Sequence, residues 1–389
     1  KAGLRMQVVF VSNYFNHHQK PLADALNKLC DDYHFISTSQ ISAERLALGY
    51  KEINAPYVID IHDGVNMQSV EHVIKEADVV IAGSAPEYLL KERKKIGRLI
   101  FRYSERPIKG KREPMKYLPR LLKWNYYNPR TAPIYLLSAS AYAPYEYSRF
   151  GLFRNRMLKW GYFTETEIYP DGFKTLCNMK KNNYILWVAR MIGLKHPETA
   201  IKIAEMLRNE GYSFTLEMIG DGPLRADMEA LISEKRLSNY VFLYGAATPE
   251  KVRTEMKKSE IFLFTSDKNE GWGAVLNEAM NSGCAAVASH EIGAVPFLIK
   301  NGESGIIYKD GDFADLFLKI KKLLDDKELC HNIGKKAYER IVGEWSPQIA
   351  AERLISVSED ILSGGKGMGL YGSGPCSKAE ILKDDWFKV

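Results

Sequence analysis

Two glutamates, Glu270 and Glu278, are separated by seven residues in the C-terminal half of this 389-residue sequence. The apolar run 261–265 before them has the length and the branched or aromatic composition of a buried parallel strand. The apolar residues within 275–280 recur at helical spacing. The loop that carries Glu270 therefore follows the carboxyl end of a strand and precedes a helix, which is where open α/β sheets bind ligands.

The loop between this strand and this helix suits a ligand that carries phosphate. Gly271 and Gly273 allow the backbone to approach a ligand closely, and the N–H groups at a helix start favour an anion. Glu270 and Glu278 then serve as acceptors for hydroxyl groups, so the segment predicts a site for a sugar diphosphate. An isolated pair of glutamates at this spacing is more often solvated, so the prediction depends on the surrounding motifs.

Five segments follow one another in a familiar order along roughly residues 184 to 345. They are Tyr184–Arg190 with Lys195, Met218–Leu224, Val241–Gly245, Thr265–Met280, and Ala285–Ser289 with Asn301–Gly305. This order resembles the large retaining glycosyltransferase family 4, whose members have the GT-B fold. The resemblance implies an α/β protein with two Rossmann-like domains facing across a cleft, and a C-terminal helix that crosses back to the first domain.

The resemblance also implies roles for individual residues. Arg190 and Lys195 match the phosphate-binding basic pair of the family and would neutralise the departing diphosphate. Glu278 would bind the ribose hydroxyls and Glu270 a hydroxyl of the transferred sugar. Ordinary surface charge is the alternative for the basic pair. The resemblance implies further contacts with the donor from Gly220, Gly245, Gly271, Trp272, Gly273, Ala274 and Val275.

Two short segments depart from the pattern of the family. Residues 283–285 read Gly-Cys-Ala where relatives have Gly-x-Pro, and residues 293–297 read Gly-Ala-Val-Pro-Phe where relatives have two glycines and then Pro-Glu. Neither change removes a charged group that is expected to contact phosphate. We interpret both as changes of shape, which leave the sugar and base contacts of these loops open.

The N-terminal half carries weaker motifs. The loop 12–19, between a predicted strand at 6–11 and a predicted helix at 21–29, is polar and aromatic and contains no glycine. In the family this loop approaches the donor phosphate and the reacting sugar, so side chains would have to make the contacts here. Adjacent histidines on a loop are also often simply exposed. The candidate contacts of this loop are Asn13, His17 and His18.

Three further apolar runs predict buried strands that end in polar residues, and they span 77–83, 98–103 and 133–138. Ser84 and Glu105 follow the first two runs and are candidate acceptor-side residues. Glu105 stands close to the position where many relatives carry a pocket histidine, which makes it a candidate acid or base. A structural ion pair with Arg102 or Arg106 is the alternative.

Length and composition favour a soluble protein of two domains, with 46% hydrophobic residues and 26% charged residues. The expected parts are an acceptor-side domain at 1–165, a nucleotide-sugar-binding domain at 166–345, a crossover helix at 346–362 and a glycine-rich tail at 363–389. No apolar stretch reaches the roughly 18 residues of a membrane-spanning helix. Five cysteines without a C-x-x-C motif indicate a reducing cytosol and no metal site.

The segment Lys91–Lys123 is strongly basic. It contains thirteen Lys or Arg and three Glu, a net charge of +10 against +6 for the whole chain. Because apolar and aromatic residues are interleaved with these cations, we predict a peripheral contact with anionic lipid at the inner face of the membrane. A solvated loop is the alternative. No nucleic-acid partner is expected, since no recognised binding module accompanies the segment.

The reaction that the resemblance implies is glycosyl transfer with retention of configuration. The donor would be a nucleotide diphosphate sugar, with uridine as the first expectation and guanosine as the second, and the acceptor a glycan or lipid-linked glycan of envelope polysaccharide synthesis. No cofactor and no metal are expected beyond this co-substrate, because the family needs no Asp-x-Asp site. The alternatives are a nucleotide-sugar epimerase of the same fold and a non-catalytic partner subunit that binds a sugar nucleotide.

Overall fold

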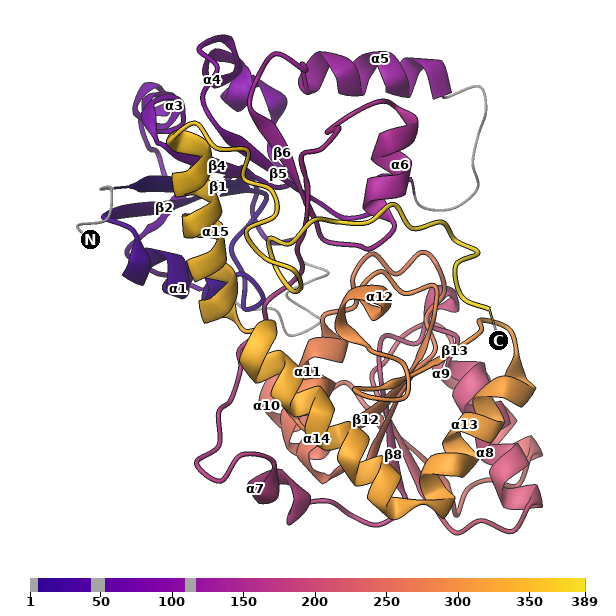
Figure 1. Cartoon of the computed structure of the whole chain (residues 1–389). Coiled ribbons are helices and arrows are strands. Elements are labelled where there is room, and N and C mark those ends of the chain that lie inside the picture. The colour runs from indigo at the N-terminus through magenta and orange to yellow at the C-terminus, as the bar shows by residue number, and fades with distance from the viewer. Residues whose placement is uncertain (1–5, 43–52, 109–116, 389) are drawn as a thin grey trace. The chain divides into compact units, whose positions relative to one another are not determined.

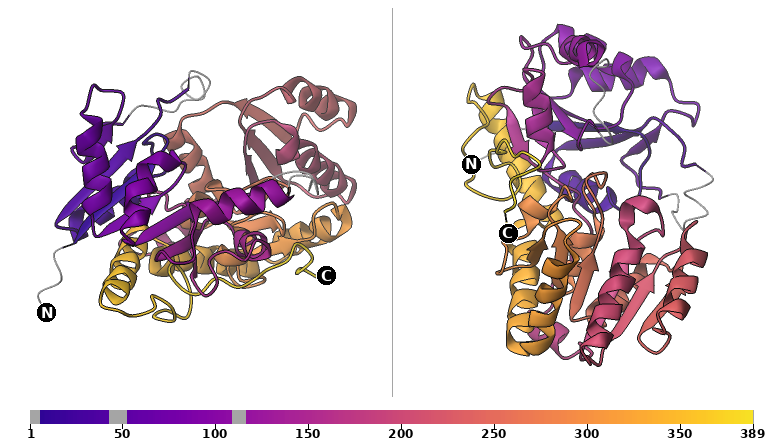
Figure 2. Two further views of the ribbon diagram at one scale, coloured as in Figure 1. Left: turned by 90° about the horizontal axis from the view of Figure 1, so that it is seen from above. Right: turned by 90° about the vertical axis from the view of Figure 1, so that its right-hand side faces the viewer.

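The computed structural model describes residues 6–42, 53–108 and 117–388. The chain forms two compact units. Unit 1 comprises Lys1–Glu165 and Trp345–Lys383, and unit 2 comprises Thr166–Glu344 and Asp384–Val389. Each unit is built around one parallel β-sheet that is flanked by helices (Figures 1 and 2).

The sheet of unit 1 has seven strands in the order β3-β2-β1-β4-β5-β6-β7. The strands are β1 (Gln7–Ser12), β2 (Asp32–Ser37), β3 (Val58–Asp60), β4 (Val79–Ala82), β5 (Ile100–Ser104), β6 (Ile134–Ser138) and β7 (Met157–Lys159). All neighbours are parallel, and Val11 lies opposite Ile36 on β2 and Ala82 on β4. The order reverses between β1 and β4, so the loops after these two strands diverge at the carboxyl edge and leave room for a ligand.

Helices connect these strands, and alternate strand residues bury both faces of the sheet. The helical segments are α1 (Lys20–Leu29), α3 (Met67–Glu76), the 3₁₀ turn η1 (Glu87–Leu90), α4 (Lys91–Lys95), α5 (Tyr117–Tyr127) and α6 (Ala143–Arg149). Val9 and Val11 join the core cluster that also contains Val70 and Ile74 of α3. Phe10, between them, points to the other face and packs on Phe35 of β2.

The sheet of unit 2 has six strands in the order β10-β9-β8-β11-β12-β13, again all parallel. The strands are β8 (Tyr184–Val188), β9 (Thr215–Ile219), β10 (Val241–Gly245), β11 (Ile261–Phe264), β12 (Ala285–Ser289) and β13 (Ile306–Tyr308). The order reverses between β8 and β11. The loops after β8 and β11 carry the two strongest motifs of the sequence, so the topology brings those motifs to one crevice position.

The helices of unit 2 lie between these strands and at their end. They are α7 (Phe173–Cys177), the 3₁₀ turn η3 (Gly193–Lys195), α8 (Pro197–Asn209), α9 (Arg225–Glu234), α10 (Pro249–Lys258), α11 (Val275–Asn281), α12 (Val295–Leu298), α13 (Phe313–Asp325) and α14 (Lys327–Glu344). The helix predicted after the glutamate-bearing loop is α11. The final helix, α15 (Pro347–Leu362), belongs to unit 1 and packs beside α1 (Figure 1).

The glycine-rich segment after α15 contains no named helix or strand, yet hydrogen bonds hold it on unit 1. The main-chain N–H of Cys376 donates to the carbonyl of Lys159 (2.8 Å), and the N–H of Lys159 donates to the carbonyl of Ser377 (2.8 Å). Ala379 N–H donates to the carbonyl of Met157 (3.0 Å). This antiparallel pairing covers the free edge of β7, which would otherwise expose unpaired backbone groups.

Arg93 of α4 is fully buried at the amino-terminal edge of the unit 1 sheet. Its guanidinium donates to the carbonyls of Leu99 (2.7 Å) and Asp78 (2.9 Å), just before β5 and β4, and to the carbonyls of Ile74 (2.9 Å) and Ala77 (2.6 Å). A single side chain therefore satisfies carbonyl groups from α3 and two strand starts.

We expect Arg93→Met to lower the free energy of unfolding by ~3 kcal/mol, because the substitution leaves several buried carbonyls without a donor. Chemical denaturation of the variant measures the loss. Lys91→Met, at an exposed position of the same helix, is the matched control and should change stability by less than about 0.5 kcal/mol. Equal effects of the two substitutions would contradict this account of Arg93.

Candidate functional site

The loops after β8 and β11 are joined by a short chain of hydrogen bonds. The indole N–H of Trp187, on β8, donates to the hydroxyl of Thr265, just after β11 (2.8 Å). That hydroxyl donates to the carbonyl of Lys195 (2.6 Å), and the N–H of Asp267 donates to the carbonyl of Leu194 (3.1 Å). These bonds fix the position of Lys195 relative to the loop that carries Glu270.

Lys195 and Glu270 form an ion pair at this edge of the sheet. Their side chains are only 15% and 14% exposed, so the interaction is weakly screened by solvent. The Glu270 carboxylate also accepts a hydrogen bond from the Ser266 hydroxyl (3.0 Å), and the Lys195 ammonium lies 5.8 Å from the centre of the Phe264 ring. The structure thus places the predicted phosphate-binding cation beside the predicted sugar-binding carboxylate.

Gly273 and Trp272 determine the conformation of this loop. Gly273 has a φ of 89°, and a Cβ there would lie 2.6 Å from the Phe264 ring, so only glycine fits. Trp272 is buried, and its indole N–H donates to the Asn277 side chain (2.9 Å). The predicted donor contact of Trp272 is therefore restricted to its main chain, as it leads into Ala274 and α11.

Glu278, the second glutamate, lies in the first turn of α11, after Val275, with a side chain that is 12% exposed. The guanidinium of Arg253, on α10, lies 4.0 Å from its carboxylate. Arg253 follows no motif in the sequence, so only the packing of α10 beside α11 identifies it.

Arg190 lies exposed after the end of β8. The predicted donor contacts Gly220 and Gly245 pair with each other, since the N–H of Gly220 donates to the carbonyl of Gly245 (2.8 Å). A Cβ at Gly220 would lie 1.8 Å from the carbonyl oxygen of Ala189. The requirement for glycine here comes first from the contact between neighbouring strand ends.

The loop after β12, where the sequence departs from its relatives, packs against the glutamate loop. The N–H of Ala294 donates to the carbonyl of Trp272 (3.2 Å), and the N–H of Gly293 approaches the carbonyl of Glu270 (3.4 Å). The Phe297 ring lies 6.3 Å from the Trp272 ring, centre to centre. An aromatic contact thus stands where relatives have a carboxylate.

His196 directly follows Lys195 and was not singled out by the sequence. It adopts a left-handed conformation (φ 47°) at the start of α8. Its Nδ1 lies 2.9 Å from the Glu198 carboxylate and its Nε2 3.3 Å from Asp267. The hydrogen bond with Glu198, helped by Asp267, raises the pKa of His196 to about 9, so the imidazole is charged at neutral pH.

In unit 1, the structure brings together His18, Glu105 and Tyr162 at the carboxyl edge of the sheet. The Tyr162 hydroxyl donates to Glu105 (2.9 Å), and the His18 ring lies 6.5 Å from the Tyr162 ring. The rings of His17 and His18 are 3.9 Å apart. Burial raises the pKa of Tyr162 well above its usual value, so the phenol keeps the proton that it donates. Tyr162 is a residue that the sequence interpretation missed.

The two arginines that were considered as alternative ion-pair partners of Glu105 both contact other carboxylates. Arg102 pairs with Glu87 (2.9 Å), and Arg106 pairs with the buried Glu146 (2.6 Å).

Asn13 and Ser84 occupy the loops at the strand reversal of unit 1. The carbonyl of Asn13 accepts from the N–H groups of Thr38 (2.6 Å) and Ser39 (2.7 Å), which holds the loop after β1 against the end of β2. Ser84 is exposed just after β4. Both residues therefore lie where a crevice is expected, on the same edge as Glu105.

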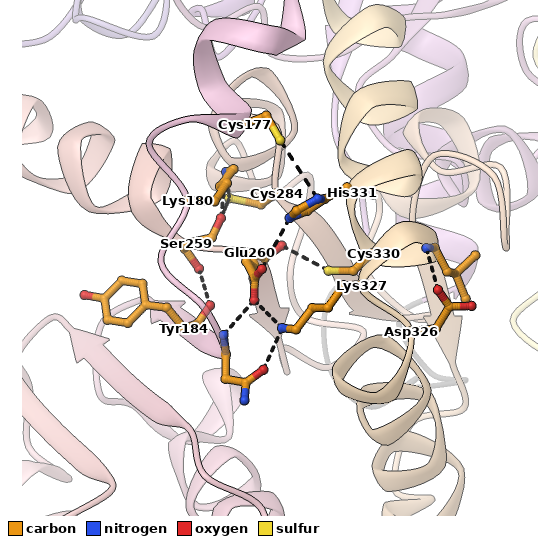
Figure 3. A network of polar contacts seen from close by, with 12 residues as sticks. Cys177, Lys180, Tyr184, Ser259, Glu260, Cys284, Asp326, Lys327, Cys330 and His331 are labelled. Carbon is orange, nitrogen blue, oxygen red and sulfur yellow. Dashed lines mark hydrogen bonds and ion pairs between the residues drawn. The ribbon is translucent and has the colours of Figure 1, made fainter.

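A second polar network lies at the opposite, amino-terminal edge of the unit 2 sheet (Figure 3). Glu260, just before β11, accepts from Lys327 (2.6 Å) and lies 3.3 Å from His331, whose other ring nitrogen is 3.9 Å from Cys177. Lys180 donates to the carbonyls of Ser259 (2.6 Å) and Ser282 (2.8 Å). This network ties α7 and α14 to the sheet, away from the candidate site.

Within the described ranges, no group of three His, Cys, Asp or Glu side chains is arranged to hold a metal ion.

Comparison with known proteins finds a matching family model and related glycosyltransferases for the region of unit 2. Residues 173–340 match the family model "Glycosyl transferases group 1". Alpha-D-kanosaminyltransferase of Streptomyces kanamyceticus is 28% identical over 177 residues, which are 46% of this chain and 45% of that protein. The capsular polysaccharide biosynthesis glycosyltransferase CapM of Staphylococcus aureus is 28% identical over 195 residues, 48% of each chain. The chain thus spans less than half the length of these relatives.

Solved structures resemble both units. HepE of Anabaena in complex with UDP matches 92% of this chain and 100% of its own, with a TM-score of 0.67 and 16% identity. The pneumococcal O-GlcNAc transferase GtfA in complex with UDP and GlcNAc matches 92% of this chain and 99% of its own, with a TM-score of 0.67 and 12% identity. These likenesses confirm the predicted α/β fold with two Rossmann-like domains of the GT-B class.

We expect the contribution of His196 to stability to depend on pH. Its folded pKa of about 9 lies above the ordinary value of 6.5, so the contribution is complete below about pH 6.5 and is lost as the pH rises through about 9. Because the side chain is partly exposed, the effect is ~1 kcal/mol. The melting temperature of His196→Gln should therefore fall below that of the wild type at pH 6 and approach it at pH 9.5.

The matched control for this experiment is His62→Gln, at an exposed loop position of unit 1. A gap between His196→Gln and the wild type that is equal at both pH values would show that the imidazole is not charged in the folded protein.

Proposed function

Because residues 173–340 match the family model of the glycosyl transferases group 1, we propose that this chain transfers a sugar from a nucleotide diphosphate sugar to a glycan or lipid-linked acceptor, with retention of configuration. The observation that carries the proposal is the half-buried Lys195–Glu270 pair at the strand reversal of unit 2. It places a cation for phosphate next to a carboxylate for hydroxyl groups. A sugar diphosphate carries phosphate and hydroxyl groups side by side, so it complements this pair.

Each charged residue has a role in this proposal. Lys195 and Arg190 neutralise the charge that develops on the leaving diphosphate. Glu270 exchanges part of its contact with Lys195 for a hydroxyl of the transferred sugar, and Glu278 accepts from the ribose. Fixing the sugar in this way aligns its anomeric carbon for the acceptor.

The cations of the protein supply the charge that a metal would otherwise supply, so we propose that transfer is independent of metal. The donor to test first is a UDP-sugar, because HepE and GtfA were solved with UDP, and a GDP-sugar is the second. The name of CapM, which refers to capsular polysaccharide biosynthesis, supports a polysaccharide as the acceptor class. On the acceptor side, we propose that His17, His18 and the Glu105–Tyr162 pair of unit 1 contact the incoming hydroxyl.

We expect Lys195→Ala to lower kcat by at least about 100-fold, because it removes a cation that acts on developing charge. Transfer from a panel of UDP- and GDP-sugars, measured as nucleotide release with and without a glycan acceptor, gives the rate, and thermal unfolding checks the fold. The control is Lys202→Ala, an exposed lysine of α8 that should keep wild-type turnover. Wild-type turnover in Lys195→Ala would remove this residue from the phosphate site.

The same assay separates the alternatives. An epimerase would rearrange the sugar with donor alone, and a non-catalytic partner subunit would bind the nucleotide sugar without releasing nucleotide under any condition. Activity that persists in the presence of EDTA would support metal independence, and loss of activity that added Mg²⁺ restores would contradict it.

The segment Lys91–Lys123 has a different surface from the one that its composition suggests. Arg93, Arg102 and Arg106 are buried in structural contacts, so they add nothing to a surface patch. Residues 109–116 lie outside the described residues. The surface charge of the described part is therefore smaller than the sequence count, and it depends mainly on exposed lysines such as Lys95 and Lys123.

Helix α5, in contrast, presents an apolar face to solvent. Leu118, Leu122 and Tyr126 are 60%, 63% and 77% exposed and follow one another at helical spacing. On the opposite side of the helix, Leu121 and Trp124 pack against the core of unit 1. We propose that the exposed face, with Lys123 beside it, lies in the interface of an anionic membrane. No helix in the described ranges is long and apolar enough to span a bilayer.

We expect the double variant Leu118→Ser/Leu122→Ser to bind vesicles containing phosphatidylglycerol about tenfold more weakly than the wild type, because it removes two inserted apolar side chains. Co-sedimentation at low and high salt measures the binding. Leu318→Ser, on α13 of unit 2, changes a leucine of equal exposure, 60%, and should have no effect. Unchanged binding of the double variant would exclude this face as the contact.

A further inference from the structure

Unit 1 contains a cavity of about 740 Å³. It lies at the edge of the sheet opposite to the edge that carries the candidate site residues of this unit. Ile134 and Met157, the first residues of β6 and β7, lie on its wall, so it opens at the amino-terminal edge of these strands. Glu105 and Ser84, in contrast, follow carboxyl ends. One wall consists of the C-terminal segment, through Met368 and Lys378. The cavity is therefore separate from the proposed acceptor site, and it shares no residue with the proposed donor site.

The lining of this cavity is strongly basic. It contains four cationic side chains, Arg130, Arg154, Arg156 and Lys378, and no Asp or Glu. We call it the basic cavity. In the part of the chain that the structure describes, none of these four is recorded in an ion pair. Cations that converge on one concave surface without carboxylates produce a positive potential that attracts anions.

The position of one of these arginines is fixed by the protein. Arg156 donates to the carbonyl of Ala132 (2.7 Å) and stacks over the Tyr135 ring at 5.6 Å. Two residues that precede Arg156, Phe153 and Asn155, have φ values of 49° and 55°, which residues other than glycine rarely adopt. Arg154 lies between them and is exposed at the cavity.

The remaining wall is largely apolar. Leu152, Phe153 and Met157 are buried side chains that line it, and Ile381 of the C-terminal segment completes it. An inorganic anion would leave this surface without a partner. A phosphate ester with an apolar portion matches both halves of the lining, because arginine binds phosphate through paired N–H donors while the apolar portion covers the hydrophobic wall.

We propose that the basic cavity binds a phosphate ester, at a site distinct from that of the donor nucleotide. The volume is within the range of about 300 to 1,000 Å³ that is usual for small-molecule sites. Because the C-terminal segment forms part of the wall, an occupied cavity also holds residues 376–383 against β7. The phosphate belongs either to a soluble metabolite or to the headgroup of a membrane lipid.

The experiment measures binding to the full chain by calorimetry, with three probes: phenyl phosphate, which is a soluble ester with an apolar portion, monomeric dihexanoyl phosphatidylglycerol, and dioctanoylglycerol, which lacks phosphate. We expect one or both phosphate probes to bind, with the dissociation constant raised about tenfold or more in Arg154→Ala/Lys378→Ala. The control Lys28→Ala/Lys91→Ala removes two exposed lysines elsewhere on unit 1 and should bind as the wild type does. Hydrogen exchange should show residues 376–383 protected by the probe.

The pattern of binding assigns the source of the phosphate. Binding of phenyl phosphate with an affinity equal to that of the lipid supports a soluble ester, whereas binding of the lipid alone supports a headgroup. Three results would overturn the proposal: no binding of either phosphate probe, binding that the Arg154→Ala/Lys378→Ala variant retains, or equal binding of dioctanoylglycerol. Nucleotide-sugar turnover with a soluble acceptor should be unchanged in this variant, so the test is independent of the proposed transfer reaction.

Discussion

The candidate site of unit 2 depends on one interaction, the ion pair between Lys195 and Glu270. Neither residue is positioned by its own segment alone. The Thr265 hydroxyl joins the two loops by accepting from Trp187 and donating to the carbonyl of Lys195. Those loops are neighbours because β8 and β11 are adjacent strands, and the reversal of strand order between them leaves room for a ligand. A half-buried pair of this kind keeps a cation and a carboxylate in place for a ligand that needs both.

The charged groups at the amino-terminal edges of both sheets differ in task from those on the candidate-site loops of unit 2. At the amino-terminal edges, Arg93 in unit 1 and Glu260 in unit 2 are buried and bind neighbouring carbonyls, amides and side chains, so they stabilise the packing of helices on strand starts. At the carboxyl edge of the unit 2 sheet, Arg190, Lys195 and Glu278 lie on loops or a helix start with part of their surface open to solvent. The basic cavity is the exception, since its exposed cations lie at an amino-terminal edge.

Local sequence patterns predicted much of this arrangement. The runs 6–11, 77–83, 98–103 and 133–138 correspond to β1, β4, β5 and β6, because continuous apolar stretches mark strands that are buried on both faces. β2 was not predicted, since Asp32 and His34 interrupt its apolar pattern. Arg253, His196 and Tyr162 were also missed, because each gains its role from a partner that is distant in the chain or from a neighbour with no motif.

The sequence by itself determined the class of the fold and the residue types of the loops after β8 and β11. Alternating apolar runs, glycines and charged residues act over a few positions, and their order along the chain is the information that the family resemblance uses. Only the tertiary structure decided which charges meet. It buried Arg93 and Arg106, which composition had counted as surface charge, and it joined the C-terminal segment to β7 to close the basic cavity. The physical reason is that burial and ion pairing depend on distances between residues far apart in sequence, which local patterns do not contain.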